Sequence, residues 1–345
     1  MNRSIKRALV SLGLLLVLAS ACSRNPGGTD SFTTESKRSI VTEEKGSEQA
    51  TMQKFTLNST VGEVLADTAF ENFGHLLFPV DRSVTENMSL ADVSTSRIFV
   101  WYNNLQPEKT VEIINHLKSR AMDGQRIFYP IYEEDEIAID SSKADTGLFY
   151  FGGEAGKPFA IMNAGGGFSY VGAMHDSFPH ALAVTDHGYN GFALIYRPND
   201  AYADLAKAIE YLYDHAEELN LSGENYSLWG GSAGARMAAS LGNAASLFQL
   251  TGRKDIPQAA AVVMQYTGYS VYSPADAPTY ANVGTNDGIA SWQTMESRLR
   301  RLESLGIATE FHVYDGLSHG FGLGTGTVAE GWFADAIAFW ESQMK

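Results

Sequence analysis

Two stretches of the chain have the spacing Gly-x-Ser-x-Gly, one centred on Ser232 and the other on Ser318. This spacing serves nucleophilic catalysis when a strand enters it and a helix leaves it, because the sharp turn then exposes the serine hydroxyl above a sheet. Ser232 follows an apolar run at 226–230 and precedes a helix-forming run at 235–245, whereas a glycine-rich stretch follows Ser318. The pattern therefore predicts Ser232 as a nucleophile and Ser318 as a loop residue.

A serine hydroxyl is a weak nucleophile at neutral pH and needs a base that a carboxylate holds in the right tautomer. Two histidines follow Ser232: His312 lies within an expected strand, and His319 lies in the loop after it. We therefore predict His319 as the base. Asp287 follows the apolar run 279–284, at the carboxyl end of an expected strand, so we predict Asp287 as the carboxylate.

An acyl-transfer site also needs N–H groups that stabilise a negatively charged oxygen. The glycines after Ala164 follow an apolar run and can bring the backbone close to a ligand. We predict the N–H group of Ala233, the residue after Ser232, as one of these donors, and N–H groups of the glycine loop at 163–168 as the others. A phosphate-binding loop is the alternative, but the glycines lack the Gly-Lys-Ser/Thr ending and the dinucleotide-binding spacing.

These residues need a scaffold, and the second part of the chain alternates short apolar runs with helical periodicity, which is typical of a parallel sheet with helices on both faces. Strands are expected at 158–163, 191–196, 226–230, 259–266, 279–284 and 310–316. Apolar spacing predicts helices from Leu205 to Leu219, from Met295 to Leu305 and from Val328 to Trp340.

The chain before residue 158 is less regular. The runs at 126–132 and 147–153 are expected to form a leading antiparallel pair joined by an acidic turn. Residues 51–125 contain a predicted helix after Pro107 and form either a cap over the site or a layer at the sheet edge. The fold class is therefore α/β with an N-terminal accessory segment.

With these elements in place, the chain resembles serine esterases of the α/β-hydrolase fold over residues 126–345. The matching motifs are AGGGF (164–168), WGGSAGARMA (229–238), VGTNDGIAS (283–291) and YDGLSHGFG (314–322). The resemblance is closest to the hormone-sensitive-lipase-like and acetyl xylan esterase-like branches.

This resemblance implies a catalytic triad of Ser232, Asp287 and His319, with the N–H groups of Gly166, Gly167 and Ala233 as oxyanion donors. We expect no cofactor and no metal. The lipase-like branch typically has histidine where this chain has Ala164. Esterases that act on acetylated sugars often lack that histidine, so the expected substrate is a small-molecule or carbohydrate ester with a short acyl group. A serine peptidase of the same fold and a non-enzymatic binding lipoprotein are the alternatives.

The N-terminus has the pattern of an export signal. Residues 1–22 contain a positive start and an apolar run that is too short to span a bilayer. The chain's single cysteine, Cys22, ends this segment after small residues, which resembles the lipobox of bacterial lipoproteins, although Ala19 stands where leucine is usual. We predict lipidation of Cys22 and a location in the cell envelope; ordinary cleavage with a bystander cysteine is the alternative.

The composition of the chain limits which classes of binding partner we expect. Residues 23–50 are polar and nearly free of aromatic residues, so we expect a flexible tether with an end-to-end distance on the order of 30 Å. The net charge of −15 argues against nucleic acid, and it leaves the lipid anchor as the expected contact with a membrane. Removal of residues 1–21 takes away three positive charges and changes −15 to −18, which favours a neutral substrate over an acidic one.

Overall fold

The computed structural model describes residues 53–79 and 82–345. The expected signal peptide, Cys22 and the tether therefore lie outside the described residues. Residues Thr51–Lys345 form one unit by their contacts. In the described part of this unit, no helix combines the length and the apolar character needed to cross a membrane.

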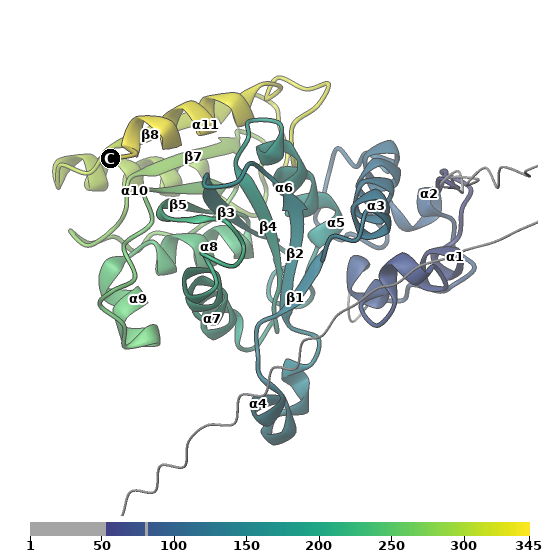
Figure 1. Cartoon of the computed structure of the whole chain (residues 1–345). Helices are drawn as coiled ribbons and strands as arrows, with labels where there is room; N and C mark the ends of the chain where they lie inside the picture. Colours follow the sequence, from purple (N-terminus) through teal and green to yellow (C-terminus); the bar gives the residue numbers. More distant parts are fainter. Residues whose placement is uncertain (1–52, 80–81) are drawn as a thin grey trace, which may run out of the picture. The chain divides into compact units, whose positions relative to one another are not determined.

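An eight-stranded sheet lies at the centre of this unit, in the order β1-β2-β4-β3-β5-β6-β7-β8 (Figure 1). β2 runs antiparallel to both of its neighbours, and the strands from β4 to β8 pair in parallel. The predicted mostly parallel sheet with a leading antiparallel pair is therefore confirmed. The strands are β1 (Phe128–Pro130), β2 (Gly147–Gly152), β3 (Pro158–Asn163), β4 (Asn190–Ile195), β5 (Ser222–Gly231), β6 (Ala261–Gln265), β7 (Thr279–Gly284) and β8 (Thr309–Tyr314).

Helices cover both faces of the sheet (Figure 1). α6 and α11 lie side by side on one face, where His180 of α6 packs against Trp332 of α11. α7 and α8 pack together on the other face, and α10 packs on β7 and β8. The helices of this part are α4 (Glu134–Ile139), α5 (Ala173–Asp176), α6 (Phe178–Thr185), α7 (Ala201–Asp214), α8 (Ala233–Leu241), α9 (Ala244–Thr251), α10 (Trp292–Ser304) and α11 (Trp332–Gln343).

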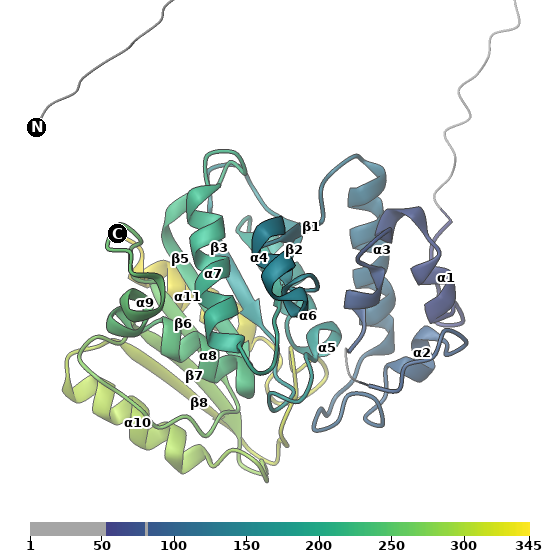
Figure 2. The same cartoon turned by 90° about the horizontal axis from the view of Figure 1, so that it is seen from below.

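The N-terminal segment forms its own small helical layer beside the sheet. Its helices are α1 (Val61–Leu65), α2 (Leu90–Val93) and α3 (Pro107–Met122), with 3-10 turns at Thr68–Phe70 and Gly74–Leu77. The predicted helix after Pro107 is confirmed as α3, which buries Ile113, Ile114 and Leu117 and packs against α5 and α6 (Figure 2).

Three sequence predictions were wrong: two placed a helix end incorrectly, and one expected a turn where the structure has a helix. α7 ends at Asp214, so Leu219 lies beyond it although its spacing continues the apolar pattern. α11 begins only at Trp332, because the preceding Gly331 has a φ of 95°, and Val328 is exposed. The acidic turn between β1 and β2 contains the helix α4, which buries no residue and therefore has no apolar periodicity to reveal it.

Candidate active site

Ser232 lies at the turn between β5 and α8. Its backbone has a φ of 52° and a ψ of −113°, values that non-glycine residues rarely adopt. The turn is tight because α8 starts directly against β3: a Cβ atom at Gly234 would overlap the carbonyl oxygen of Asn163. Glycine two residues after the serine is therefore required, and the strand-to-helix turn expected at Ser232 is present.

The structure brings Ser232, His319 and Asp287 together. His319 Nε2 lies 3.0 Å from Ser232 Oγ, and His319 Nδ1 lies 2.8 Å from Asp287 Oδ2. The other carboxylate oxygen of Asp287 accepts hydrogen bonds of 2.8 Å from the N–H groups of Ile289 and Ala290. The Asp287 side chain is 0% exposed and that of His319 is 6% exposed, so this hydrogen-bonded chain is shielded from water.

The three elements that carry these side chains end at the same edge of the sheet. Ser232 follows β5, Asp287 follows β7, and His319 follows β8, all at carboxyl ends of parallel strands. Parallel strands place their carboxyl ends together, which is why residues 87 positions apart can be neighbours. Ser318 lies in the loop after β8, as expected.

The predicted oxyanion loop lies against Ser232. A Cβ atom at Gly165 would be 2.9 Å from the Cβ of Ser232, so the two backbones approach closely. Gly166 has a φ of 123°, which only glycine adopts without strain, and its carbonyl oxygen accepts from the N–H of Ser169. Among the described residues, no acceptor is found for the N–H of Gly166, Gly167 or Ala233, so all three can donate to a ligand.

A buried carboxylate that the sequence analysis did not identify holds this loop. Asp176 accepts a 2.6 Å hydrogen bond from the Gly165 N–H, and two tyrosine hydroxyls donate to it, Tyr102 at 2.9 Å and Tyr266 at 2.5 Å. Burial, with the Asp176 charge as a second cause, raises the pKa of both tyrosines well above 10, so both stay protonated and donate. The sequence feature that could have identified Asp176 is its position as a carboxylate within the largely apolar stretch 170–184.

The N-terminal segment reaches the site through residues 101–103. The Asn103 side chain donates to the carbonyl oxygen of His319 at 2.7 Å, and its backbone N–H donates to the carbonyl oxygen of Gly320 at 3.0 Å. Trp101 is 44% exposed, and its ring lies against Gly167, where an added Cβ would be 2.9 Å from it. The segment therefore contacts both the oxyanion loop and the histidine loop.

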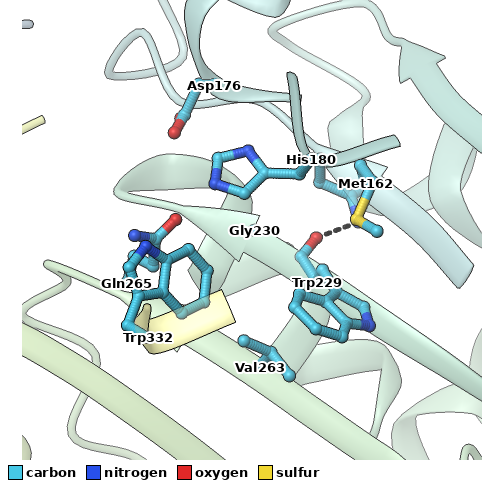
Figure 3. Close-up of a pocket in the computed structure, with 9 residues that line it drawn as sticks. Met162, Asp176, His180, Trp229, Gly230, Val263, Gln265 and Trp332 are labelled. Carbon is cyan, nitrogen blue, oxygen red and sulfur yellow. Dashed lines mark hydrogen bonds between the residues drawn. The ribbon is translucent and has the colours of Figure 1, made fainter. Parts of the chain in front are cut away.

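A small cavity of about 10 Å³ lies between β3, β5, β6 and the helices α6 and α11 (Figure 3). The His180 imidazole lies there between Asp176 and Gln265 (Figure 3). Neither ring nitrogen of His180 has a hydrogen-bond partner among the described residues, and burial lowers its pKa, although the Asp176 charge opposes this. His180 is therefore a neutral packing residue, and Trp229 and Trp332 beside it are buried core residues, as expected.

Part of the chain is similar to a known protein family. Residues 153–287 match the sequence model of the BD-FAE family, a range that contains Ser232 and Asp287 and ends before His319. No protein with a curated description matches the chain.

Several solved structures are similar to part of the chain. Esterase 2 from Thermogutta terrifontis is 20% identical with a TM-score of 0.52, and the match covers 63% of this chain and 95% of the other. The acetyl ester-xyloside bifunctional hydrolase from Caldicellulosiruptor lactoaceticus is 19% identical with a TM-score of 0.53, covering 62% and 95%. The carboxylesterase Cest-2923 from Lactobacillus plantarum WCFS1 is 18% identical with a TM-score of 0.50, covering 57% and 92%. The chain therefore has the α/β-hydrolase fold.

Proposed function

We propose that the protein is a serine hydrolase of carboxylic esters that acts through an acyl-enzyme. The observation that carries the proposal is the hydrogen-bonded chain from Ser232 Oγ through His319 to the buried carboxylate of Asp287. The named similar structures are esterases or an ester hydrolase, which supports the same chemistry.

Each residue has a defined step in this reaction. Ser232 Oγ attacks the ester carbonyl carbon while His319 Nε2 takes the hydroxyl proton, and Asp287 stabilises the resulting imidazolium. The carbonyl oxygen becomes negatively charged and accepts hydrogen bonds from the N–H groups of Gly166, Gly167 and Ala233. His319 then gives the proton to the leaving alcohol oxygen, and the acyl group stays on Ser232.

Water completes the cycle. His319 Nε2 accepts a proton from the water molecule as its oxygen attacks the acyl carbonyl carbon. The bond between the carbonyl carbon and Ser232 Oγ breaks, the proton returns to Ser232, and the carboxylic acid leaves. The base and the oxyanion donors therefore serve both halves of the reaction.

A short acyl chain and an acetylated carbohydrate are the substrate features that we propose. The cavity at Ser232 measures about 250 Å³, below the roughly 300–1,000 Å³ of sites for drug-sized ligands. The similar hydrolase from Caldicellulosiruptor lactoaceticus acts, by its name, on an acetyl ester and a xyloside. Rates on p-nitrophenyl acetate, butyrate and octanoate beside an acetylated sugar test this, and fastest turnover of the octanoate would contradict it.

The second serine of the same spacing provides a matched control for the proposed activity. Ser232→Ala removes the attacking oxygen and is expected to lower kcat on p-nitrophenyl acetate by at least about 10³-fold, while the circular dichroism spectrum stays that of the unsubstituted protein. Ser318→Ala changes the loop serine and is expected to retain activity. Persistent hydrolysis by purified Ser232→Ala would contradict the proposal.

We also propose that the protein is exported and anchored to the cell envelope through a lipid on Cys22. The small residues before the only cysteine, at the end of an apolar run, support this. Cys22→Ser is expected to move the protein from the membrane fraction to the soluble fraction, and an unchanged distribution would contradict lipidation.

A further inference from the structure

Among the residues that the structure describes, the cavity at Ser232 is lined by a positively charged residue and by no negatively charged one. Its lining combines the nucleophile, two of the oxyanion donors and apolar or neutral side chains, and Arg236 is the one charged residue among them. The residues that line it are Gly167, Phe168, Ser232, Ala233, Arg236, Tyr266, Thr267, Gly268, Ile289 and Ala290. Asp287, although close by in sequence, keeps its carboxylate buried against His319.

Arg236 is placed by the helix that follows the nucleophile. It lies four residues after Ser232, and its N–H donates to the Ser232 carbonyl oxygen at 3.4 Å in the first turn of α8. Residues four apart lie on the same face of a helix, so the arginine stays beside the serine. Arg236 is exposed, so its guanidinium is accessible to a ligand.

The guanidinium has no carboxylate partner among the described residues. Three other arginines do have one: Arg197 pairs with Asp204, Arg253 with Asp214, and Arg298 with Asp276. An arginine keeps its charge at any physiological pH, so Arg236 gives the cavity a positive charge that no described side chain neutralises.

The aromatic neighbours of Arg236 do not neutralise it either. Phe168 lines the cavity and packs against Tyr202 with ring centroids 5.8 Å apart. Burial raises the pKa of Tyr202, and the nearby Arg236 charge only partly opposes this, so the phenol is neutral at physiological pH. Phe168 in the cavity lining and Tyr202 packed against it therefore add no charge that opposes Arg236.

We propose that Arg236 binds a carboxylate on the ester substrate, so that the preferred substrate is an ester that also carries a free acid group. This inference rests on the proposed ester hydrolysis and names its substrate class. A guanidinium binds a carboxylate through paired, charge-assisted hydrogen bonds. The net charge of −15 would favour a neutral substrate, but the local charge beside Ser232 is the one that a bound substrate meets at short range.

The experiment compares two esters that carry a carboxylate with their neutral methyl esters, and hydrolysis is followed by release of the phenol, which the methyl ester group does not give. The first pair, 4-acetoxybenzoate and its methyl ester, places the carboxylate on the alcohol side. The second pair, mono-p-nitrophenyl glutarate and methyl p-nitrophenyl glutarate, places it on the acyl side. The ratio of kcat/KM for the charged ester to kcat/KM for the neutral ester is measured for each pair, after subtraction of uncatalysed hydrolysis, in the unsubstituted protein and in Arg236→Gln, Arg236→Lys and Arg236→Glu.

We expect Arg236→Gln to lower this ratio by about 10- to 100-fold for at least one pair, in line with the loss of a hydrogen-bonded charge partner. Arg236→Lys should retain part of the ratio, because its ammonium keeps the charge without the paired geometry, and Arg236→Glu should favour the neutral ester. Salt should lower the ratio in the unsubstituted protein. Arg300→Gln, at an exposed site on α10, is the matched control and should leave the ratio unchanged.

The outcomes separate this inference from the proposed function. If the unsubstituted protein hydrolyses both members of each pair and Arg236→Gln lowers their rates equally, the arginine does not select a carboxylate and this inference is wrong, whereas ester hydrolysis stands. If the unsubstituted protein hydrolyses none of the four esters, ester hydrolysis fails and this inference fails with it.

Discussion

The backbone of Ser232 shows why a Gly-x-Ser-x-Gly spacing between a strand and a helix predicts a nucleophile at this position. Its φ of 52° costs on the order of 1–3 kcal/mol for a non-glycine residue, and the surrounding contacts must hold it. The Ser232 N–H donates to the Gln265 carbonyl oxygen at 2.9 Å, and Gly234 packs without room for a Cβ atom. Because the turn itself requires the glycines, the sequence could predict this residue without any knowledge of its partners.

His175 provides a prediction at the same scale, for stability rather than catalysis. Burial lowers its pKa to about 3, and its ring lies edge-on to Phe99 with centroids 4.2 Å apart. The unfolded chain binds a proton at this residue below pH 6.5 and the folded chain only near pH 3. The free energy of unfolding should therefore fall by about 1.4 kcal/mol per pH unit from this group as the pH drops from 6.5 towards 3.

Urea unfolding between pH 7 and pH 4.5 measures this slope. His175→Phe keeps a ring in the same apolar site and removes the titration, so its unfolding free energy should depend less steeply on pH than that of the unsubstituted protein. His187→Asn, at an exposed position, is the control. Equal slopes for the His175→Phe variant and the unsubstituted protein would contradict the assignment.

At the scale of elements, the loop after α2 contributes to positioning the site as much as the strands that carry it. Strand positions follow from short-range apolar patterns, and β3 and β7 have the predicted bounds, 158–163 and 279–284. The Tyr102 hydroxyl contacts the carboxylate of Asp176, which is 74 positions away in the sequence. The Asn103 amide contacts the backbone of His319, which is 216 positions away. Such polar contacts leave no periodic pattern in a sequence, so they could not be predicted.

The Tyr102 hydroxyl tests the role of this loop. Tyr102→Phe keeps the ring but removes one of the three donors to Asp176, which holds the Gly165 N–H. We expect a loss of about 1.5–3 kcal/mol in the free energy of unfolding and a several-fold lower kcat with little change in KM, because the oxyanion loop is less firmly held. Tyr189→Phe, which loses a hydroxyl contact to Glu341, is the control. An unchanged kcat in Tyr102→Phe would show that the loop is held without this contact.

At the scale of the whole molecule, the fold class was predictable and the use of the N-terminal segment was not. Alternating strands and helices over residues 126–345 indicate a doubly covered parallel sheet, and the structure has one. Residues 51–125 were expected to be either a cap or an edge layer. The segment packs beside the sheet through α3 and also reaches the site through residues 101–103, because α3 and the loop before it contact different parts of the same unit.

The net charge of the whole chain and the charge of the cavity at Ser232 have opposite signs. The chain carries −15 overall, whereas the cavity at Ser232 has Arg236 as its charged residue. Net charge governs long-range approach and solubility, and the residues that line a cavity govern what binds there. Composition alone therefore predicted a neutral substrate, and only the placement of Arg236 one turn after Ser232 indicates an acidic one.

Covalent labelling with a fluorophosphonate tests the central claim, that Ser232 is an activated nucleophile, most directly. The reagent phosphonylates a serine oxygen only when a base such as His319 takes its proton. We expect one label per chain by intact mass, located on Ser232 by peptide mapping, with no label on Ser232→Ala. An unlabelled protein, or a label located on Ser318 or any other residue, would contradict the account.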